Sequence, residues 1–302
     1  MGRGELRLAL IGTGYLGGSF ALALKKAGLL QCSRGYDTSA EALRHAVQRN
    51  IVDESALGAA AAVADADVVV LATPVGAIGE VASQIAPALA PGALVLDLGS
   101  TKAHVVETVG KALKDPGCFI GAHPIAGREF SGCEHADAKL FDGHPVILTP
   151  SARTHATAIA DCVQLWSAVG ARVVTMDAAE HDRVFGVVSH LPHVAAFALA
   201  AAVAGALEGD EAIARRAAGL FGGGFADTTR VAASSPSMWR DILVDNREVL
   251  RPLLARLSGE LREIARAVDE SDGEAIAKLV ERAARGRALV MNADDGDSKK
   301  RS

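Results

Sequence analysis

The chain has 302 residues, 50% of them hydrophobic but only 4% aromatic, so one or two domains with a core of Ala, Val and Leu are expected. The formal net charge of −5 leaves no basic excess for nucleic acid, and we expect no such partner. The four cysteines are scattered, with no Cys-x-x-Cys pair and no metal-ligand spacing. This cysteine usage predicts reduced thiols in a cytoplasmic protein without a metal site.

Short apolar runs alternate with amphipathic stretches through the first part of the chain. The predicted strands are Leu6–Ile11, Cys32–Tyr36, Val68–Ala72, Leu94–Leu98, Cys118–Gly121, Pro145–Leu148 and Arg172–Thr175. The predicted helices between them are Leu16–Ala27, Ala40–Arg49, Ile78–Leu89, Lys102–Leu113 and Thr154–Val169. Strands that alternate with helices predict an α/β fold with a doubly wound, mainly parallel sheet.

A glycine-rich turn, Gly12-Thr13-Gly14-Tyr15-Leu16-Gly17, lies between the first predicted strand and the first predicted helix. In such a turn the first glycine permits a tight bend, the second lets the backbone approach a pyrophosphate, and the third lets helix pack on strand. The N-terminus of the helix offers free N–H groups to the phosphates. We therefore predict a Rossmann-type dinucleotide site whose contacts are Gly12, Gly14, Tyr15, Leu16 and Gly17.

An acidic residue follows at the spacing that such domains use for the adenosine ribose. Asp37 ends the second predicted strand, 20 residues after Gly17. A carboxylate there accepts hydrogen bonds from the ribose and repels a 2′-phosphate, so NAD is favoured over NADP. Thr73-Pro74 and Ser100 end later strands on the same side and are predicted to contact the cofactor. Turn formation alone is the alternative explanation for Thr73-Pro74.

The strand pattern stops after Asp177, and the chain is helical in pattern from there to Arg287. We predict a dinucleotide-binding Rossmann domain over residues 1–176 and an all-helical substrate and dimerisation domain over 177–290. The tail at 291–302, which is mostly polar or charged, is expected to be disordered.

The longest apolar segment of the helical half is Val194–Leu207. It is shorter than the ~20 residues that a spanning helix needs, so we expect no membrane association. A buried helix or a subunit interface is expected instead. Helices that are apolar nearly all round need a partner, and the Ala-rich faces of this half predict a homodimer.

The segment Gly121–Gly132 follows a predicted strand, so His123 is expected where a strand ends and a loop begins. Ligands of open α/β sheets bind outside the carboxyl ends of the strands. A histidine there can exchange a proton near neutral pH, since its unperturbed pKa is ~6.5. A loop histidine without a role is the alternative.

Three motifs resemble those of the prephenate and arogenate dehydrogenase family. The first is His-Pro-Ile-Ala-Gly-x-Glu-x-Ser-Gly at residues 123–132, and the second is Ser189-His190-Leu191-Pro192-His193. The third comprises Gly222-Gly223-Gly224-Phe225, Thr229-Arg230 and Met238-Trp239-Arg240-Asp241. The motifs occur in the order that the family has them, and the resemblance runs from about residue 7 to 285.

The resemblance implies an enzyme that carries out an NAD-linked oxidative decarboxylation of a cyclohexadienol. The product is 4-hydroxyphenylpyruvate from prephenate, a step of tyrosine biosynthesis, or tyrosine from arogenate. Hydride must leave a carbinol carbon toward the nicotinamide while the carbinol O–H loses its proton, and loss of CO₂ aromatises the ring. Such a site needs a base and cationic groups that hold carboxylates.

The resemblance assigns His123 as the general base and places Ser100 between the nicotinamide and the substrate hydroxyl. A helix N-cap is the alternative role for Ser100. Arg230 is expected to hold a substrate carboxylate, because a guanidinium fork grips a carboxylate in two bonds. The other substrate contacts that the resemblance implies are His193, Ser189, Glu129 and Trp239. For Trp239, a buried core position on an amphipathic helix is the alternative.

Three further features have local explanations. Lys102 is expected to be a surface residue in the first turn of a helix, with a phosphate or substrate contact as the alternative. His181-Asp182 resembles the start of a helix in the family, where an aspartate can orient a neighbour or cap the helix. His190 and His193 lie three residues apart, but no Glu or Cys nearby completes a metal set, so no metal is predicted.

Several hypotheses stay open. Prephenate and arogenate differ only by a keto or an amino group, and no residue of the sequence decides between them. A β-hydroxyacid-type dehydrogenase is a second hypothesis, although the chain has no lysine between Asp177 and Lys278 that would serve as the base of such an enzyme. A non-catalytic, NAD-responsive regulator is a third, and it would need neither His123 nor Arg230.

Overall fold

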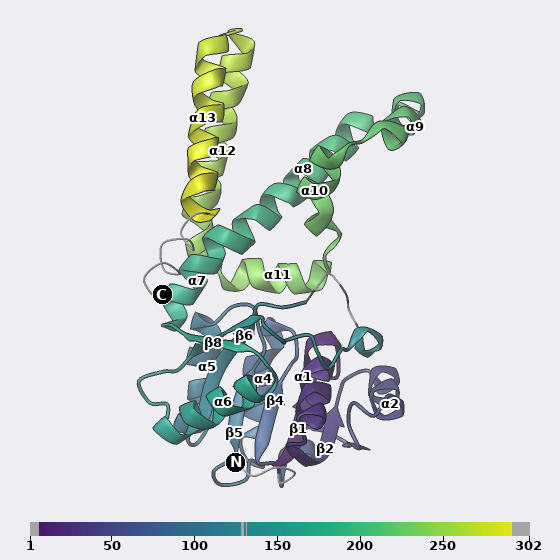
Figure 1. Cartoon of the computed structure of the whole chain (residues 1–302), viewed down its shortest axis with the longest axis vertical. Helices are drawn as coiled ribbons and strands as arrows, with labels where there is room; N and C mark the ends of the chain where they lie inside the picture. The colour runs from purple at the N-terminus through teal and green to yellow at the C-terminus, as the bar shows by residue number, and fades with distance from the viewer. Residues whose placement is uncertain (1–5, 128–129, 131, 292–302) are drawn as a thin grey trace. The chain divides into compact units, whose positions relative to one another are not determined.

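The computed structural model describes residues 6–127, 130 and 132–291 (Figure 1). Internal contacts divide the chain into two compact units, residues 1–250 and residues 251–302. The first unit carries the sheet and every predicted site residue, so it positions the candidate site.

The described part of the first unit is built on an eight-stranded sheet with the strand order β3-β2-β1-β4-β5-β6-β7-β8. The strands are β1 (Leu6–Ile11), β2 (Leu30–Tyr36), β3 (Glu54–Ser55), β4 (Val68–Leu71), β5 (Leu94–Asp97), β6 (Phe119–Pro124), β7 (Pro145–Thr149) and β8 (Arg172–Thr175). Strands β6 and β7 pair antiparallel, and the other neighbouring pairs are parallel. The strand order reverses between β1 and β4, which is where doubly wound sheets bind their ligands.

Helices cover both faces of the sheet because residues along each strand point alternately to the two sides. Leu8 and Leu10 of β1 belong to one buried cluster, and Ala9 and Ile11 belong to the other. The first cluster includes side chains of α1 (Tyr15–Lys26), α2 (Ala40–Gln48) and α6 (Ala156–Ala168). The second includes side chains of α3 (Ala59–Val63), α4 (Val75–Ile85) and α5 (Ala103–Ala112). The predicted α/β, doubly wound architecture is confirmed.

The predicted strands are all present: β1 and β8 have the predicted bounds, and the others differ by one to three residues at one or both ends. The sequence pattern missed β3, which has two residues, and α3, which has five. Elements this short carry no measurable periodicity. Strand β6 continues to Pro124, so His123 lies inside a strand and not in the loop after it.

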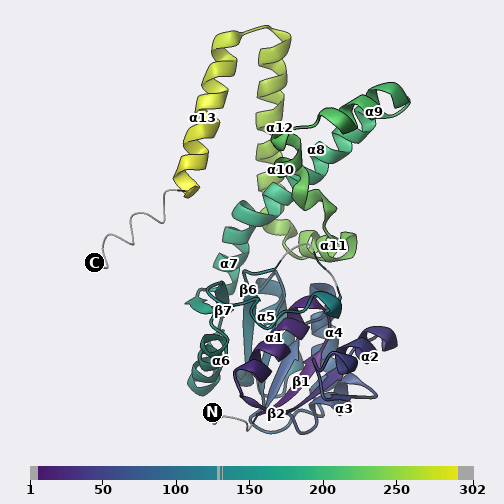
Figure 2. The same ribbon diagram turned by 45° about the vertical axis from the view of Figure 1, so that its right-hand side comes forward.

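After β8 the described chain contains only helices and turns. They are α7 (Ala178–Phe185), η3 (Gly186–His190), α8 (Leu191–Leu207), α9 (Glu211–Leu220), α10 (Gly223–Thr229), η4 (Arg230–Ala233), α11 (Pro236–Asp245), α12 (Arg247–Asp269) and α13 (Gly273–Met291). The all-helical second half of the predicted fold class is confirmed. In the second unit, α12 and α13 form a hairpin (Figure 2) in which Arg282 pairs with Glu260 and Glu263.

The predicted domain boundary at residue 176 stays a prediction. The compact units divide after Leu250 because α7 packs against α5 and α11 packs against α4, which joins these helices to the sheet domain. The predicted disordered tail lies outside the described residues, except for Met291, the last residue of α13.

Segments α7, η3 and α8 form one continuous helix, Ala178–Leu207, of 30 residues. By length and composition it is able to cross a membrane: an 18-residue window has a mean hydropathy of 1.7, and 11% of that window is buried. The expectation that this apolar segment is too short to span a membrane, or is a buried helix, is therefore wrong. The reason is that the π-helical turn η3 joins the polar start of the helix to its apolar end. A single helix of this kind is weak evidence for a membrane protein, and a subunit interface remains the other expectation.

Candidate active site

The glycine-rich turn after β1 leaves no room for side chains at two of its three glycines. Gly12 has a φ of 94°, and a Cβ there would lie 2.5 Å from the carbonyl oxygen of Ala72. A Cβ on Gly17 would lie 2.6 Å from the carbonyl oxygen of Gly12. A Cβ on Gly14, by contrast, would meet nothing within 4 Å. Two glycines are therefore needed for the fold, and the third lies beside open space.

Helix α1 begins directly after Gly14, and no side chain of the described residues caps it. Its first N–H groups and the positive end of its dipole are thus available to an anion. The predicted contact Tyr15 is the first residue of this helix, while Leu16 packs against the core cluster beside the sheet. The open space beside Gly14 and the uncapped helix fit the pyrophosphate of a dinucleotide.

Asp37 lies beside the turn and helps to hold it in shape. Its Oδ2 accepts hydrogen bonds from the backbone N–H of Thr13 at 2.8 Å and from the Thr13 hydroxyl at 3.1 Å. Its Oδ1 accepts the backbone N–H of Ser39 at 2.9 Å. A carboxylate has about four lone-pair sites, so Asp37 keeps acceptor capacity for a ribose hydroxyl. The predicted ribose contact thus has a second, structural task.

Thr73 and Pro74 connect β4 to α4 at the edge of the sheet where β1 ends. Pro74 is the N-cap residue of α4. The hydroxyl oxygen of Thr73 is buried and has no hydrogen-bond partner among the described residues. A buried hydroxyl without a partner is rare, and a bound ligand would supply one.

His123 lies on a part of β6 that extends beyond β5. The parallel ladder between β5 and β6 ends at Ile120. Strand β6 then continues to Pro124 along β7, where His123 pairs with Ile147. This placement puts a partly exposed imidazole at the carboxyl edge of the sheet, as the sequence predicted.

A buried ion pair holds the extended part of β6. Asp97 and Lys102 are fully buried and pair with each other. Asp97 accepts the backbone N–H of Ala122 at 3.2 Å, and Nζ of Lys102 donates to the Ala122 carbonyl at 3.1 Å. Burial raises the pKa of Asp97, and the charge of Lys102 opposes that rise. The ion pair thereby fixes both the N–H and the carbonyl of Ala122, the residue before His123.

The expectation that Lys102 is a surface residue is wrong. The physical reason lies in Asp97, because a carboxylate at the end of a buried strand needs a cation. The available signal for this pair was the acidic Asp97 inside the apolar run Leu94–Leu98.

A chain of hydrogen bonds leads from His123 into α7. Nδ1 of His123 lies 2.8 Å from Nε2 of His181, and Nδ1 of His181 lies 2.8 Å from Oδ1 of Asp182. The carboxylate of Asp182 also accepts the backbone N–H groups of Lys102 and Ala103, each at 2.8 Å. Asp182 therefore caps the N-terminus of α5 from another segment of the chain.

Ser100 lies half-buried in the loop between β5 and α5. The N-cap residue of α5 is Lys102, and the capping carboxylate belongs to Asp182. The alternative role of Ser100 as the N-cap is therefore wrong, while its predicted contact with substrate and cofactor stays a prediction.

The surroundings of the histidine chain keep both imidazoles neutral. The ring of Phe185 lies 4.8 Å from that of His123 and 4.5 Å from that of His181. Burial, followed by the nearby His181 and Lys102, holds the pKa of His123 well below its usual range. Burial also lowers the pKa of His181. Burial alone would raise the pKa of Asp182, but its hydrogen bonds with His181 and the backbone outweigh this and lower that pKa.

The predicted substrate contacts His193, Trp239 and Ser189 lie together. The ring of His193 stacks on Trp239 with 4.0 Å between centroids, and Trp239 is buried. Nδ1 of His193 donates to the backbone carbonyl of Ser189 at 2.8 Å. Ser189 supports His193 through its carbonyl, from the π-helical turn η3, a form often found at functional sites.

A neighbouring pair joins this group to the histidine chain. Nδ2 of Asn246 donates to Nδ1 of His190 at 2.9 Å and to the backbone carbonyl of Asp182 at 2.9 Å. The ring of His190 lies edge-on to Trp239 at 5.9 Å. Burial lowers the pKa of His190 to about 4. Sequence reasoning assigned no role to His190 or Asn246, because the contact between them spans 56 residues.

The two other predicted substrate contacts are Arg230 and Glu129. Arg230 is exposed and begins η4, which packs against α8 and α10. Helix α8 also carries His193, but the convergence of Arg230 with His123 stays a prediction. Glu129 lies outside the described residues.

The loop after His123 returns to the start of α1. A Cβ on Gly127 would lie 3.2 Å from Cε1 of Tyr15, and the ring of Phe130 lies edge-on to Tyr15 at 6.1 Å. The first signature motif and the glycine-rich turn are therefore brought together.

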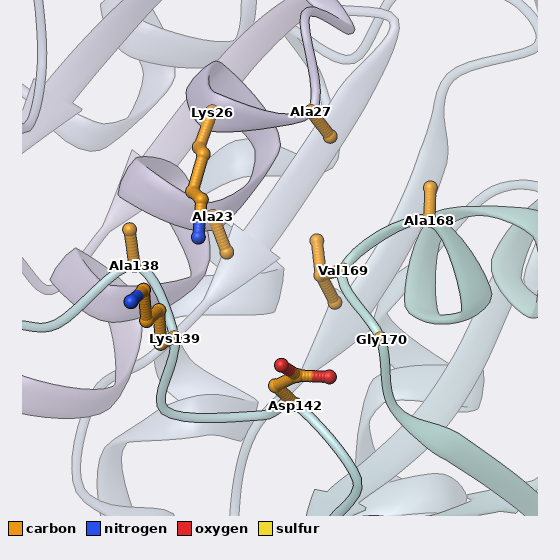
Figure 3. A pocket seen from close by; sticks show the side chains of 9 residues that line it. All are labelled: Ala23, Lys26, Ala27, Ala138, Lys139, Asp142, Ala168, Val169 and Gly170. Carbon is orange, nitrogen blue, oxygen red and sulfur yellow. The ribbon is translucent and has the colours of Figure 1, made fainter.

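Among the described residues, no metal cluster marks this site, and a surface hollow lies away from it. The described residues contain no group of three or more His, Cys, Asp or Glu that could hold a metal ion. A surface hollow of about 310 Å³ (Figure 3) lies where α1 ends and not where its glycine-rich turn lies. Its lining residues are Ala23, Lys26, Ala27, Ala138, Lys139, Asp142, Ala168, Val169 and Gly170.

The sequence matches two domain models of one family. The nucleotide-binding domain of prephenate dehydrogenase matches residues 20–175, and the dimerization domain of prephenate dehydrogenase matches residues 177–282. A cyclohexadienyl dehydrogenase of Zymomonas mobilis is 35% identical over 288 residues, which cover 95% of this chain and 97% of the relative. A prephenate dehydrogenase of Bacillus subtilis is 34% identical over 268 residues, which cover 88% of this chain and 71% of the relative.

A solved structure agrees with these matches. Prephenate dehydrogenase from Aquifex aeolicus in complex with hydroxyphenyl propionate and NAD⁺ superimposes with a TM-score of 0.84 at 33% identity, covering 95% of this chain and 98% of the other. The two domain models together span most of the chain, and the relatives match over nearly its whole length. The chain belongs to the prephenate dehydrogenase family.

Proposed function

We propose that the protein catalyses the NAD-dependent oxidative decarboxylation of prephenate to 4-hydroxyphenylpyruvate in tyrosine biosynthesis, with His123 as the general base. One observation carries this proposal. His123 lies at the carboxyl edge of the sheet with Nδ1 held by His181, and its loop contacts the start of α1 at Tyr15. Within the described residues, Nε2 of His123 makes no hydrogen bond and is available to a substrate.

The cofactor proposal rests on the glycine-rich turn. The open space beside Gly14, the uncapped start of α1 and the buried hydroxyl of Thr73 fit a dinucleotide. The carboxylate of Asp37 supports NAD over NADP, because it would repel a 2′-phosphate. A relative of known structure, the enzyme from Aquifex aeolicus, is described as a complex with NAD⁺. When bound, NAD supplies the acceptor for the hydride.

The side chains of the crevice have separate tasks in the proposed reaction. Nε2 of His123 takes the proton of the carbinol hydroxyl while the hydride leaves, and the hydroxyl of Ser100 orients that group. Arg230 and His193 hold the substrate carboxylates. Loss of CO₂ aromatises the ring and makes the reaction favourable. The remaining proposed substrate contacts are Ser189, Glu129 and Trp239.

Arogenate is a second candidate substrate. The observation that favours it is the similarity to a relative named cyclohexadienyl dehydrogenase, at 35% identity. Membership of the family favours either cyclohexadienol over the substrates of a β-hydroxyacid-type dehydrogenase.

We also propose a cytoplasmic homodimer. Helix Ala178–Leu207 exposes apolar side chains, among them Val187, Val188 and Leu199, which are 47%, 48% and 39% exposed in the single chain. A second copy of the chain would cover such a surface. The family's name for the matching domain, a dimerization domain, supports this assembly.

Assays of NADH formation test the proposal with both substrates and both nicotinamide cofactors. We expect turnover of prephenate with NAD, and a loss of about 10²–10⁴-fold in kcat for His123→Asn, the usual contribution of a general base. NAD binding by the variant, measured by fluorescence titration, should be unchanged. A His123→Asn variant with full activity would rule out this base.

A further inference from the structure

The hydrogen-bond chain behind His123 has a direction that follows from its last member. The carboxylate of Asp182 accepts two backbone N–H groups and has a lowered pKa, so it is ionised and has no proton to donate. In the contact of 2.8 Å between Asp182 and His181, the donor must therefore be Nδ1–H of His181.

The same reasoning extends to His123. Because burial keeps His181 neutral, its second nitrogen, Nε2, carries a lone pair and accepts. The contact of 2.8 Å between the two rings then requires that His123 donates from Nδ1. A neutral His123 with its proton on Nδ1 has its lone pair on Nε2, the nitrogen without a hydrogen bond among the described residues.

We propose that His181 and Asp182 are positioning residues that fix the tautomer of His123, so that Nε2 is the basic nitrogen of the reaction. This inference rests on the proposed function of His123. In the proton transfer, the O–H bond of the substrate breaks, an N–H bond forms at Nε2, and the Nδ1–H bond of His123 is retained. The resulting imidazolium then donates a charge-assisted hydrogen bond to His181, which Asp182 orients.

Among the titratable groups around His123, Asp182 is the anion at the end of its hydrogen-bond chain. Lys102, at the start of α5, lowers the pKa of His123 and forms an ion pair with Asp97 of β5. His190, on η3, is neutral near pH 7 because burial lowers its pKa to about 4. The negative charge of Asp182 therefore favours the charged form of His123 during the reaction, through the imidazole between them.

Two substitutions of His181 separate a positioning role from a structural one. The amide of Gln reaches about as far as Nε2 of histidine, so His181→Gln keeps an acceptor for His123. The shorter amide of Asn reaches only as far as Nδ1, so His181→Asn keeps the contact to Asp182 and removes the acceptor for His123. A purely structural role through Asp182 would spare the Asn variant, whereas the proposed role spares the Gln variant.

The test combines nitrogen NMR with kinetics on the full-length protein in the presence of NAD. In protein labelled with ¹⁵N-histidine, long-range ¹H–¹⁵N spectra report which nitrogen is protonated, and His123→Asn identifies the signals of His123. We expect Nδ1–H in the wild type and in His181→Gln, and a mixture of tautomers in His181→Asn. In kinetics, kcat of His181→Asn should fall by about 10- to 100-fold, the range for losing a hydrogen bond to a charged group. KM for prephenate and the melting temperature should change little, and His181→Gln should recover most of kcat.

The outcomes distinguish this inference from the function on which it rests. A wild-type His123 protonated on Nε2, or a His181→Asn variant with full kcat beside an inactive His123→Asn, would overturn the positioning role alone. An active His123→Asn would instead overturn the proposed base, whatever the tautomer. The wild-type spectrum decides the tautomer even if both variants of His181 fail to fold.

Discussion

The glycine-rich turn and the histidine chain both lie at the carboxyl edge of the sheet but are built in opposite ways. The turn consists of six consecutive residues and depends on missing side chains, since a Cβ on Gly12 would lie 2.5 Å from a carbonyl oxygen. The histidine chain joins His123 to His181, which is 58 positions away in the sequence, and continues to Asp182. It depends on buried polar groups that satisfy one another's hydrogen bonds. The turn should therefore be destabilised when side-chain atoms are added, and the buried polar groups should be destabilised when one of their partners is removed.

The largest expected effect tests the claim that buried polar groups are destabilised when a partner is removed. Lys102→Met leaves the buried carboxylate of Asp97 without its cation, and breaking a buried pair costs about 3–5 kcal/mol. Lys111→Met is a matched control on the same helix, because its pair with Glu107 is exposed to solvent and contributes little to stability. The free energy of unfolding, from urea titration followed by circular dichroism, should separate the two variants. Equal losses would contradict the claim that burial makes the Lys102 pair important.

The next effect concerns the buried imidazoles near Asp182. The pKa of His190 is about 4 in the folded protein and ~6.5 when unfolded, so the unfolded state binds more protons between these values. Stability should therefore fall as pH is lowered from 6.5 to 4, by about 1.4 kcal/mol per pH unit and about 3 kcal/mol in total for this group.

The pKa values of His123 and His181 are also lowered in the folded protein, so both residues add to the dependence of stability on pH. Urea titrations across this pH range measure how the free energy of unfolding changes with pH. His190→Gln should reduce that slope by the contribution of about one proton, which is about 1.4 kcal/mol per pH unit. An unchanged slope in His190→Gln would mean that His190 is protonated in the folded state.

The smallest effect tests the turn. Gly12→Ala forces a side chain into a φ of 94° against Ala72, and we expect a loss of about 1–3 kcal/mol in stability. Gly14→Ala meets no neighbour in the structure, so its melting temperature should equal that of the wild type. Its NAD affinity should fall by about 10-fold, or 1.4 kcal/mol, because the methyl group occupies the space proposed for the pyrophosphate. Calorimetry measures both quantities, and normal NAD binding by Gly14→Ala would place the cofactor elsewhere.

The local pattern of the sequence was sufficient for every described strand except the two-residue β3, for the turn and for the position of His123 at the sheet edge. It failed where a residue's neighbours lie far away along the chain. Lys102 follows a strand and starts a helix, which is typical of a surface lysine, yet it is buried against Asp97. The apolar composition of Val194–Leu207 was recognised, but the length of the helix that contains it was underestimated, because a π-helical turn joins this segment to α7.

By itself, the sequence determined the alternation of strands and helices, the dinucleotide turn and the family motifs, because periodicity and glycine positions act between residues close along the chain. Only the tertiary structure decided which groups touch: the N-terminus of α5 capped by Asp182, the ion pair that fixes Ala122, and the contact of His123 with His181. The Asp182 cap and the His123–His181 contact bring α7 residues to α5 and β6, as α7 packs against α5, and the ion pair forms between β5, the start of α5 and β6. In each case buried polar groups take the partners that the packing brings within hydrogen-bond distance.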